Sequence, residues 1–337
     1  MGLFSSPSVL ESCGRSDEID CRLRWADQLG AGHKDLAAFV RVQCELHRLG
    51  EVVDEIVEAG GGVPVARSAE YARLKREERR LLSAFGDVWA AEVKLPPVDT
   101  VRFAKGCPDR LTVNAAHPDL PDCLDRLPGL APTVRAITFM LPPGRRAPSA
   151  LVDQILRFEA ATRVDRLALV GGGWGDAAAR AIAGSVHARR LKSLTLSDCR
   201  LGPAAVKAIV SSPYLGDLEY LNLGGNGLLE DGFAALALLP AALPALRQLD
   251  LGGTGMTDAA AEHLAGGPAL TGPGLTELTI AGNPLTAAGV RHFLNAEHLA
   301  DTWITFDARS LPAHSRGETK RRLDRHNGIR TGHGRAP

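Results

Sequence analysis

An eleven-residue pattern of leucine and asparagine constrains the fold of this chain more than any other feature. In its clearest copy, residues 218–228 read L-x-x-L-x-L-x-x-N-x-L, with Asn226 at the ninth position. We refer to this pattern as the repeat frame. Aligned copies of the repeat frame begin at Val134, Val164, Leu191, Leu218, Leu246 and Leu275. Successive copies are 30, 27, 27, 28 and 29 residues apart, and such regular spacing indicates one structural unit used repeatedly.

The repeat frame is typical of leucine-rich repeats, in which each copy contributes a short strand and a returning segment. At this repeat length we expect the return to be a full α-helix, and in this the repeats resemble the ribonuclease-inhibitor-like class. Alanine-rich segments at 177–184, 204–210, 233–239, 259–265 and 287–294 fit these helices. Their predicted openers are Asp176, Pro203, Asp231, Thr257-Asp258 and Thr286, residue types that favour helix starts.

A single repeat cannot bury its leucines, so stacked neighbours must form the core together. Aromatic residues make up only 5% of the chain against 45% apolar residues, which suits thin layers of Leu, Val and Ala. The sequence therefore predicts an α/β fold, a leucine-rich-repeat solenoid. Parallel strands would form its concave face and α-helices its convex face, with a small α-helical module before the array.

Two sets of polar residues in the repeat frame are predicted to serve the fold. Ninth-position side chains should turn inward and bind loop backbone, which makes Asn226 and Asn283 structural and buries Cys199. Second-position residues alternate in charge, and neighbouring strands lie about 4.8 Å apart. Cross-strand ion pairs there would each stabilise the sheet by about 0.2–1 kcal/mol. This predicted ladder consists of Arg135, Asp165, Lys192, Glu219 and Arg247.

The third and fifth positions of the repeat frame should face outward from the strands. In three successive copies they form one predicted concave patch, consisting of Tyr220, Asn222, Gln248, Asp250 and Glu277. Concave faces are where solenoid proteins bind partners, and exposed tyrosine is a frequent hot-spot residue. The alternative is a sheet face that only contacts solvent.

Before the repeats, apolar residues recur at helical spacing in residues 17–29, 36–59 and 68–85. Short runs at 101–103 and 111–113 are expected to be strands that cover the open end of the array. Across the first helical hairpin we expect Asp27 to pair with Arg41, and Gln43 to cap or bridge a turn. A polar binding site between the helices, involving Glu45 as well, is the alternative.

Residues 22–29 read R-L-R-W-A-D-Q-L and residues 39–46 read F-V-R-V-Q-C-E-L. Both blocks resemble the pattern of the bacterial repeat-companion domain. The likeness extends through residues 78–82, Trp89, 103–106 and 110–113. Gln28 stands where the family usually has tryptophan, so the sequence departs from the pattern there. The resemblance implies a helical module beside a leucine-rich-repeat array and implies no chemistry.

The ends of the chain differ from its middle in composition. Residues 309–337 carry eight Lys/Arg against Glu318 and Asp324, a net charge of +6 within a chain whose formal net charge is zero. The predicted organisation is a disordered lead-in at 1–15, a helical module at 16–95, a capped repeat array at 96–307 and a basic, flexible tail at 308–337.

The sequence predicts a cytoplasmic protein with reduced cysteines. Its six cysteines form no C-x-x-C pair, and we find no secretory signal and no apolar run long enough to span a bilayer. No Walker, Rossmann, G-x-S-x-G or H-E-x-x-H motif occurs. We therefore expect no enzyme, no cofactor, no metal and no membrane association.

The function favoured by the sequence is a non-enzymatic scaffold that binds an unknown protein partner on the concave face. The alternative is a nucleic-acid or anionic-surface adaptor that acts through the basic tail. Because no aromatic residues lie among the charges of the tail, nucleic acid is the less favoured partner.

Overall fold

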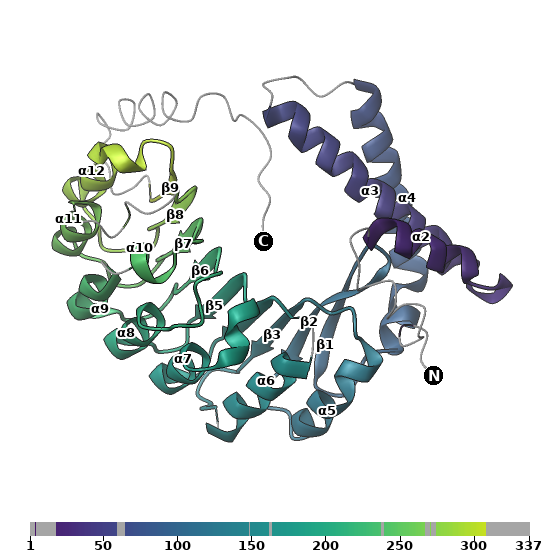
Figure 1. Ribbon diagram of the computed structural model, residues 1–337, viewed down its shortest axis with the longest axis horizontal. Coiled ribbons are helices and arrows are strands. Elements are labelled where there is room, and N and C mark those ends of the chain that lie inside the picture. The colour runs from purple at the N-terminus through teal and green to yellow at the C-terminus, as the bar shows by residue number, and fades with distance from the viewer. Residues whose placement is uncertain are drawn as a thin grey trace. The chain divides into compact units, whose positions relative to one another are not determined.

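The structure is a computed structural model of the 337-residue chain. It describes residue 4 and residues 18–58, 65–147, 149–161, 164–236, 239–266, 270 and 274–307. The fold is mixed α/β, with helices and strands alternating along most of the chain (Figure 1). In the described part of the chain, nine strands follow one another in a single open sheet in the order of the sequence.

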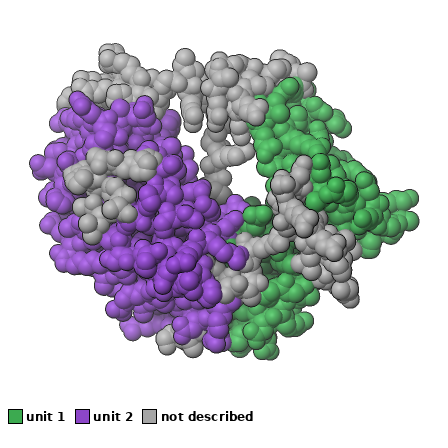
Figure 2. Space-filling view, in the orientation of Figure 1, with its two compact units in different colours: residues 1–138, 158–164 green, residues 139–157, 165–337 purple. Residues whose placement is uncertain are grey.

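The chain divides into two compact units, which Figure 2 distinguishes by colour. Unit 1 comprises residues 1–138 and 158–164, and unit 2 comprises residues 139–157 and 165–337. The division passes through strand β3 (Ala136–Met140) and helix α6 (Ser149–Ala161). Residues 96–138, which the sequence analysis assigned to the repeat array, are grouped with the N-terminal helices.

Unit 1 consists mainly of helices followed by a β-hairpin. The helices are α2 (Glu18–Gln28), α3 (Lys34–Glu58), α4 (Val65–Ala91) and α5 (Leu120–Leu130), with a 3-10 turn at Ala31–His33. Strands β1 (Val98–Ala104) and β2 (Cys107–Asn114) pair antiparallel, and they contain the two strands predicted at 101–103 and 111–113.

Aromatic rings form the core of unit 1. The Phe39 ring is fully buried, and its centroid lies 4.8 Å from that of Trp89 and 5.9 Å from that of Phe103. Phe4 is also fully buried and packs on Trp25 and Phe103. Phe4 is the one described residue of the predicted lead-in at 1–15; the others lie outside the described residues.

Unit 2 contains six parallel strands and the helices that connect them. The strands are β4 (Arg166–Val170), β5 (Ser193–Ser197), β6 (Tyr220–Asn222), β7 (Gln248–Asp250), β8 (Glu277–Thr279) and β9 (Trp303–Thr305). The helices are α7 (Gly175–Ala183), α8 (Pro203–Val210), α9 (Leu229–Leu236), α10 (Leu239–Ala242), α11 (Asp258–Gly266) and α12 (Ala287–Asn295). Further 3-10 turns lie at Val186–Arg190 and Glu297–Leu299. Figure 1 shows α7, α8, α9, α11 and α12 along one side of these strands.

The strand register confirms the alignment of the repeat frame from β4 to β8. Each pairing joins the same frame position of successive copies, as in Leu194 with Leu221 and Leu221 with Leu249. The inward column of leucines is at most 2% exposed and consists of Leu167, Leu194, Leu221, Leu249 and Leu278. Burial of a leucine side chain contributes about 1.5–3 kcal/mol, so these columns form the core of unit 2.

Asn226 and Asn283 occupy equivalent buried positions between repeats. The Asn226 side-chain oxygen accepts hydrogen bonds from the N–H groups of Cys199 and Leu201, both at 3.0 Å. Its amide nitrogen donates to the carbonyls of Leu196 and Leu223, both at 2.7 Å. Asn283 likewise accepts from the Met256 N–H and donates to the carbonyls of Leu251 and Ile280. Both side chains thus satisfy loop backbone across two repeats.

Two aspartates that were predicted to cap their own helices accept hydrogen bonds from the following repeat instead. Asp176 accepts a hydrogen bond from the Gly202 N–H at 2.7 Å. Asp258 accepts from the N–H of Thr286 at 2.9 Å and also from its hydroxyl. The prediction for these two residues was incomplete, because sequence position alone does not reveal which helix start lies beside a carboxylate in the stacked array.

None of the described helices is both long enough and apolar enough to cross a membrane. The predicted basic tail at 308–337 lies outside the described residues. Its flexibility and its proposed use in nucleic-acid binding therefore stay predictions.

Candidate functional site

The structure brings the five residues of the predicted patch together on strands β6, β7 and β8. The register places Tyr220 beside Gln248 and Gln248 beside Glu277. In the same way it places Asn222 beside Asp250. Glu277 is exposed and the other four are half-buried, whereas the alternate residues Leu221, Leu249 and Leu278 point into the core. The five side chains therefore share the face of the strands opposite to the leucines.

Asn222 is the centre of a hydrogen-bond network on this face. Its amide nitrogen donates to the Tyr220 hydroxyl oxygen at 3.2 Å and to the Asp250 carboxylate at 3.1 Å. Its side-chain oxygen accepts from the Gly224 N–H at 2.7 Å. Asp250 in turn accepts from the Gly252 N–H at 2.8 Å. Both side chains are therefore held in place by backbone groups of the fold.

Tyr220 keeps its proton at neutral pH. Burial raises the pKa of its hydroxyl, and the charges of Asp250 and Glu277 raise it further, although the hydrogen bond with Asn222 opposes the shift. The neutral phenol presents an apolar ring with a polar end, a combination frequent at binding surfaces.

Trp303 extends the same face beyond the predicted patch. The register pairs Glu277 with Trp303 and Thr279 with Thr305. The Trp303 side chain is 46% exposed, whereas the neighbouring Ile304 is buried. Trp303 was not predicted as part of the face, because it follows the last copy of the repeat frame. Its place there becomes visible when the strand register is extended from Glu277 to Trp303.

Four acidic residues lie on or at the end of this face. Besides Asp250 and Glu277 they are Asp198, which follows β5, and Asp307, which follows β9. The Asp307 carboxylate accepts a hydrogen bond from the Gly282 N–H at 2.6 Å. The Asp198 side chain lies against Gly225. A Cβ atom on residue 225 would stand 2.2 Å from the Asp198 carboxylate oxygen, and the backbone of Gly225 has φ of +69°, so residue 225 must be glycine.

The outward positions of β5–β9 carry no lysine or arginine, and their charged residues are Asp250, Glu277 and Asp307, so the net charge of the face is negative. These positions are Ser193, Thr195, Ser197, Tyr220, Asn222, Gly224, Gln248, Asp250, Gly252, Glu277, Thr279, Ala281, Trp303, Thr305 and Asp307. We refer to this surface, together with Asp198, as the acidic face.

The residues of the predicted ladder lie just before the strands, at their amino ends. Lys192 and Glu219 form an ion pair at 3.1 Å between side chains that are 46% and 54% exposed. Asp165 pairs at 3.3 Å with Arg166, the next residue along the chain. Arg247 donates to the Leu246 carbonyl, and the backbone N–H of Arg135 donates to the backbone carbonyl of Asp109. An exposed pair such as Lys192–Glu219 contributes about 0.2–1 kcal/mol.

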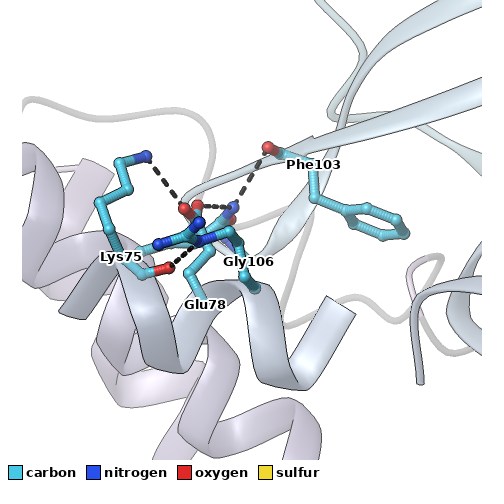
Figure 3. A network of polar contacts seen from close by, with 6 residues as sticks. Lys75, Glu78, Phe103 and Gly106 are labelled. Carbon is cyan, nitrogen blue, oxygen red and sulfur yellow. Dashed lines mark hydrogen bonds and ion pairs between the residues drawn. The ribbon is translucent and has the colours of Figure 1, made fainter. Parts of the chain in front are cut away.

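Three of the polar residues singled out in the N-terminal helices, Asp27, Arg41 and Gln43, have structural partners. Asp27 and Arg41 pair at 2.6 Å, as predicted. Gln43 donates to Glu78 and to the Phe103 carbonyl and accepts from the Gly106 N–H at 2.7 Å, so it bridges the β1–β2 turn (Figure 3). The Gly106 backbone has φ of +79° and lies against Val40, which excludes any side chain there. These contacts fix the hairpin to α3 and α4.

Burial disfavours the thiolate at two of the five described cysteines, Cys199 and Cys123, whereas arginine side chains donate hydrogen bonds to the sulfurs of Cys21 and Cys107. Cys199 is fully buried and its thiol donates to the Leu169 carbonyl at 3.1 Å. Burial raises the pKa of Cys199 to about 12 and that of Cys123 to about 11. The five described cysteines form no disulfide with one another, and the described residues contain no group of three or more His, Cys, Asp or Glu that could hold a metal.

A hollow of about 420 Å³ lies on the helix side of unit 2, at the starts of α8, α9 and α11. Its lining includes Leu229, Phe233 and Thr257. Leu229 is 66% exposed and has a left-handed backbone with φ of +55°. The hollow is mainly apolar and contains none of the five residues predicted for binding.

No protein-family model matches the sequence, and the search of curated proteins finds no relative.

Proposed function

We propose that this protein is a non-enzymatic leucine-rich-repeat scaffold that holds a protein partner on the acidic face. Support for a repeat solenoid comes from the constant register of β4–β8 and from the equivalent bonding of Asn226 and Asn283. In such an array the acidic face is the concave surface, and the helices are on the convex side.

The single observation that carries this function is the Tyr220–Asn222–Asp250 network. Two of its side chains are fixed by backbone N–H groups, and Tyr220 and Trp303 supply aromatic surface on the same side of the sheet. Fixed side chains lose little conformational entropy when a partner binds, and rigid aromatic anchors dominate many interfaces. A merely solvated sheet face has no need of this arrangement.

We further propose that the N-terminal helices are a repeat-companion module. The blocks that carry the resemblance contain Asp27, Arg41 and Gln43, and the contacts of these three residues join α2, α3, α4 and the β1–β2 turn. The module would therefore stabilise unit 1, and it is not assigned a binding role.

Affinity capture with a face variant tests the binding proposal. The variant Tyr220→Ala, Asp250→Ala, Glu277→Ala removes one large and two acidic side chains from the acidic face. A matched control, Leu229→Ala, Asp231→Ala, Glu262→Ala, removes a similar set of exposed side chains from the helix side. We expect the face variant to lose a partner that the intact protein and the control both retain. Identical partner sets for all three proteins contradict the proposal.

A further inference from the structure

The acidic face and the basic segment of this chain, residues 308–337, have opposite charge. Asp198, Asp250, Glu277 and Asp307 give the face four negative charges, and the basic segment has a net charge of +6. Within the described part of the chain, no lysine or arginine forms an ion pair with these four carboxylates. The described strands and helices of unit 2 therefore supply no ion-pair partner for these four carboxylates.

The basic segment starts at the acidic face itself. Asp307, the last described residue, is held to Gly282 by its side chain. Four strand spacings separate β5 from β9, a distance of about 19 Å at about 4.8 Å each. An extended chain advances about 3.3 Å per residue, so about six residues suffice to cross all five strands. The basic segment is long enough to do so with most of its length to spare.

We propose that the basic segment binds the acidic face of its own chain and competes there with the protein partner. The inference rests on the proposed function, because it makes the partner site the site that is regulated. Arginine–carboxylate pairs provide charge-assisted hydrogen bonds, and the exposed Trp303 ring offers a surface for arginine stacking. Short tethers give effective concentrations in the millimolar range, so even a weak contact is well populated.

The fluorescence of Trp303 can report on this contact, because Trp303 is exposed and the other three tryptophans are at most 6% exposed. Fluorescence quenching by acrylamide, which is uncharged, therefore reports mainly on Trp303. The key variant keeps the full chain and replaces Arg309, Arg316, Lys320, Arg321, Arg322 and Arg325 by glutamine. We expect stronger quenching in this variant than in the intact protein, and the same increase in the intact protein at high salt.

A synthetic peptide of residues 309–337 tests the same contact from outside. It should bind a chain ending at residue 307 and protect Trp303 from acrylamide. The double variant Asp250→Asn, Glu277→Gln in that shortened chain should bind the peptide roughly tenfold more weakly, equivalent to about 1.4 kcal/mol. Asp231→Asn, Glu262→Gln on the helix side is the matched control and should leave peptide affinity unchanged.

Unchanged Trp303 quenching in the glutamine variant, together with no peptide binding, overturns the inference. Protection of Trp303 that depends on protein concentration also overturns it, since the contact would then join two copies. Either result leaves the proposed function intact if the face variant still loses its partner in affinity capture. Peptide binding combined with unchanged partner sets would instead uphold the contact and contradict the proposed function.

Discussion

Two amides of one repeat, Asn226 and Asn222, show how the inner and outer regions of unit 2 differ. Asn226 is 2% exposed, and its side chain bonds only to backbone groups of two repeats. Asn222 is half-buried and bonds to one backbone N–H and to the side chains of Tyr220 and Asp250. The same chemical group thus joins repeats in one place and arranges a surface in the other.

The difference lies in what remains available after folding. Inside, the Asn226 carboxamide is buried and bonds only to backbone groups, so a change there leaves buried backbone groups without partners and acts on stability. On the acidic face, folding fixes the side chains while leaving charged and aromatic groups exposed, so a change there should act on binding. Three predictions separate these two consequences.

The largest effect is expected for Asn226→Ala. The N–H groups of Cys199 and Leu201 would lose their acceptor, and each buried unsatisfied group costs about 1–3 kcal/mol. We expect a loss of about 2–5 kcal/mol in the free energy of unfolding, measured by urea denaturation. Asn222→Ala is the comparison and should cost less than about 1 kcal/mol, as is usual at surfaces. Equal losses for the two variants would refute the distinction.

A smaller effect, a shift in the pKa of the Tyr220 hydroxyl, is expected when Asp250 is neutralised. Removal of a nearby negative charge favours the phenolate, so Asp250→Asn should lower the raised pKa of Tyr220 towards about 10. Ultraviolet absorbance at alkaline pH measures this in a background where Tyr71 and Tyr214 are phenylalanine. Asp231→Asn, on the helix side, should leave the titration unchanged. A Tyr220 pKa that does not respond to Asp250→Asn would show that the carboxylate does not act on the ring.

The smallest effect concerns Asp258, which joins two repeats from the exposed surface. Hydrogen bonds with Thr286 hold the pKa of Asp258 below its usual value. A carboxylate with a lowered pKa in the folded state stabilises the fold at pH values above its unfolded-state pKa of about 3.9. This stabilisation is lost as the pH falls through the folded-state pKa. Asp258→Asn should therefore flatten the acid limb of the stability curve slightly. Denaturation midpoints measured between neutral and acid pH test this, and an unchanged slope would contradict it.

Much of unit 2 follows from its sequence because leucines and asparagines recur at fixed intervals. The repeat frame places Leu221, Asn226 and Tyr220 correctly, since strand register preserves the alternation of inward and outward side chains. The five residues of the predicted patch lie together for the same reason.

Other features depend on spatial neighbours that the sequence pattern does not reveal. Helix α5 belongs to no copy of the repeat frame, so the repeat does not predict it, although its buried residues Leu120, Cys123, Leu124 and Leu127 do recur at helical spacing. Trp303 follows the last copy and has no leucine register of its own, so its place on the acidic face is visible only through its pairing with Glu277. Asp176 bonds to the next repeat, and that adjacency arises only when repeats stack.

Site-specific photo-crosslinking tests most directly whether the acidic face is a binding surface. A photoreactive amino acid would replace Gln248, at the centre of the face, and in a second protein Glu262, on the helix side. The account predicts a discrete crosslinked partner from position 248 that is absent from position 262 and lost in the Tyr220→Ala, Asp250→Ala, Glu277→Ala background. The same crosslinked species from both positions, or none from position 248, would contradict it.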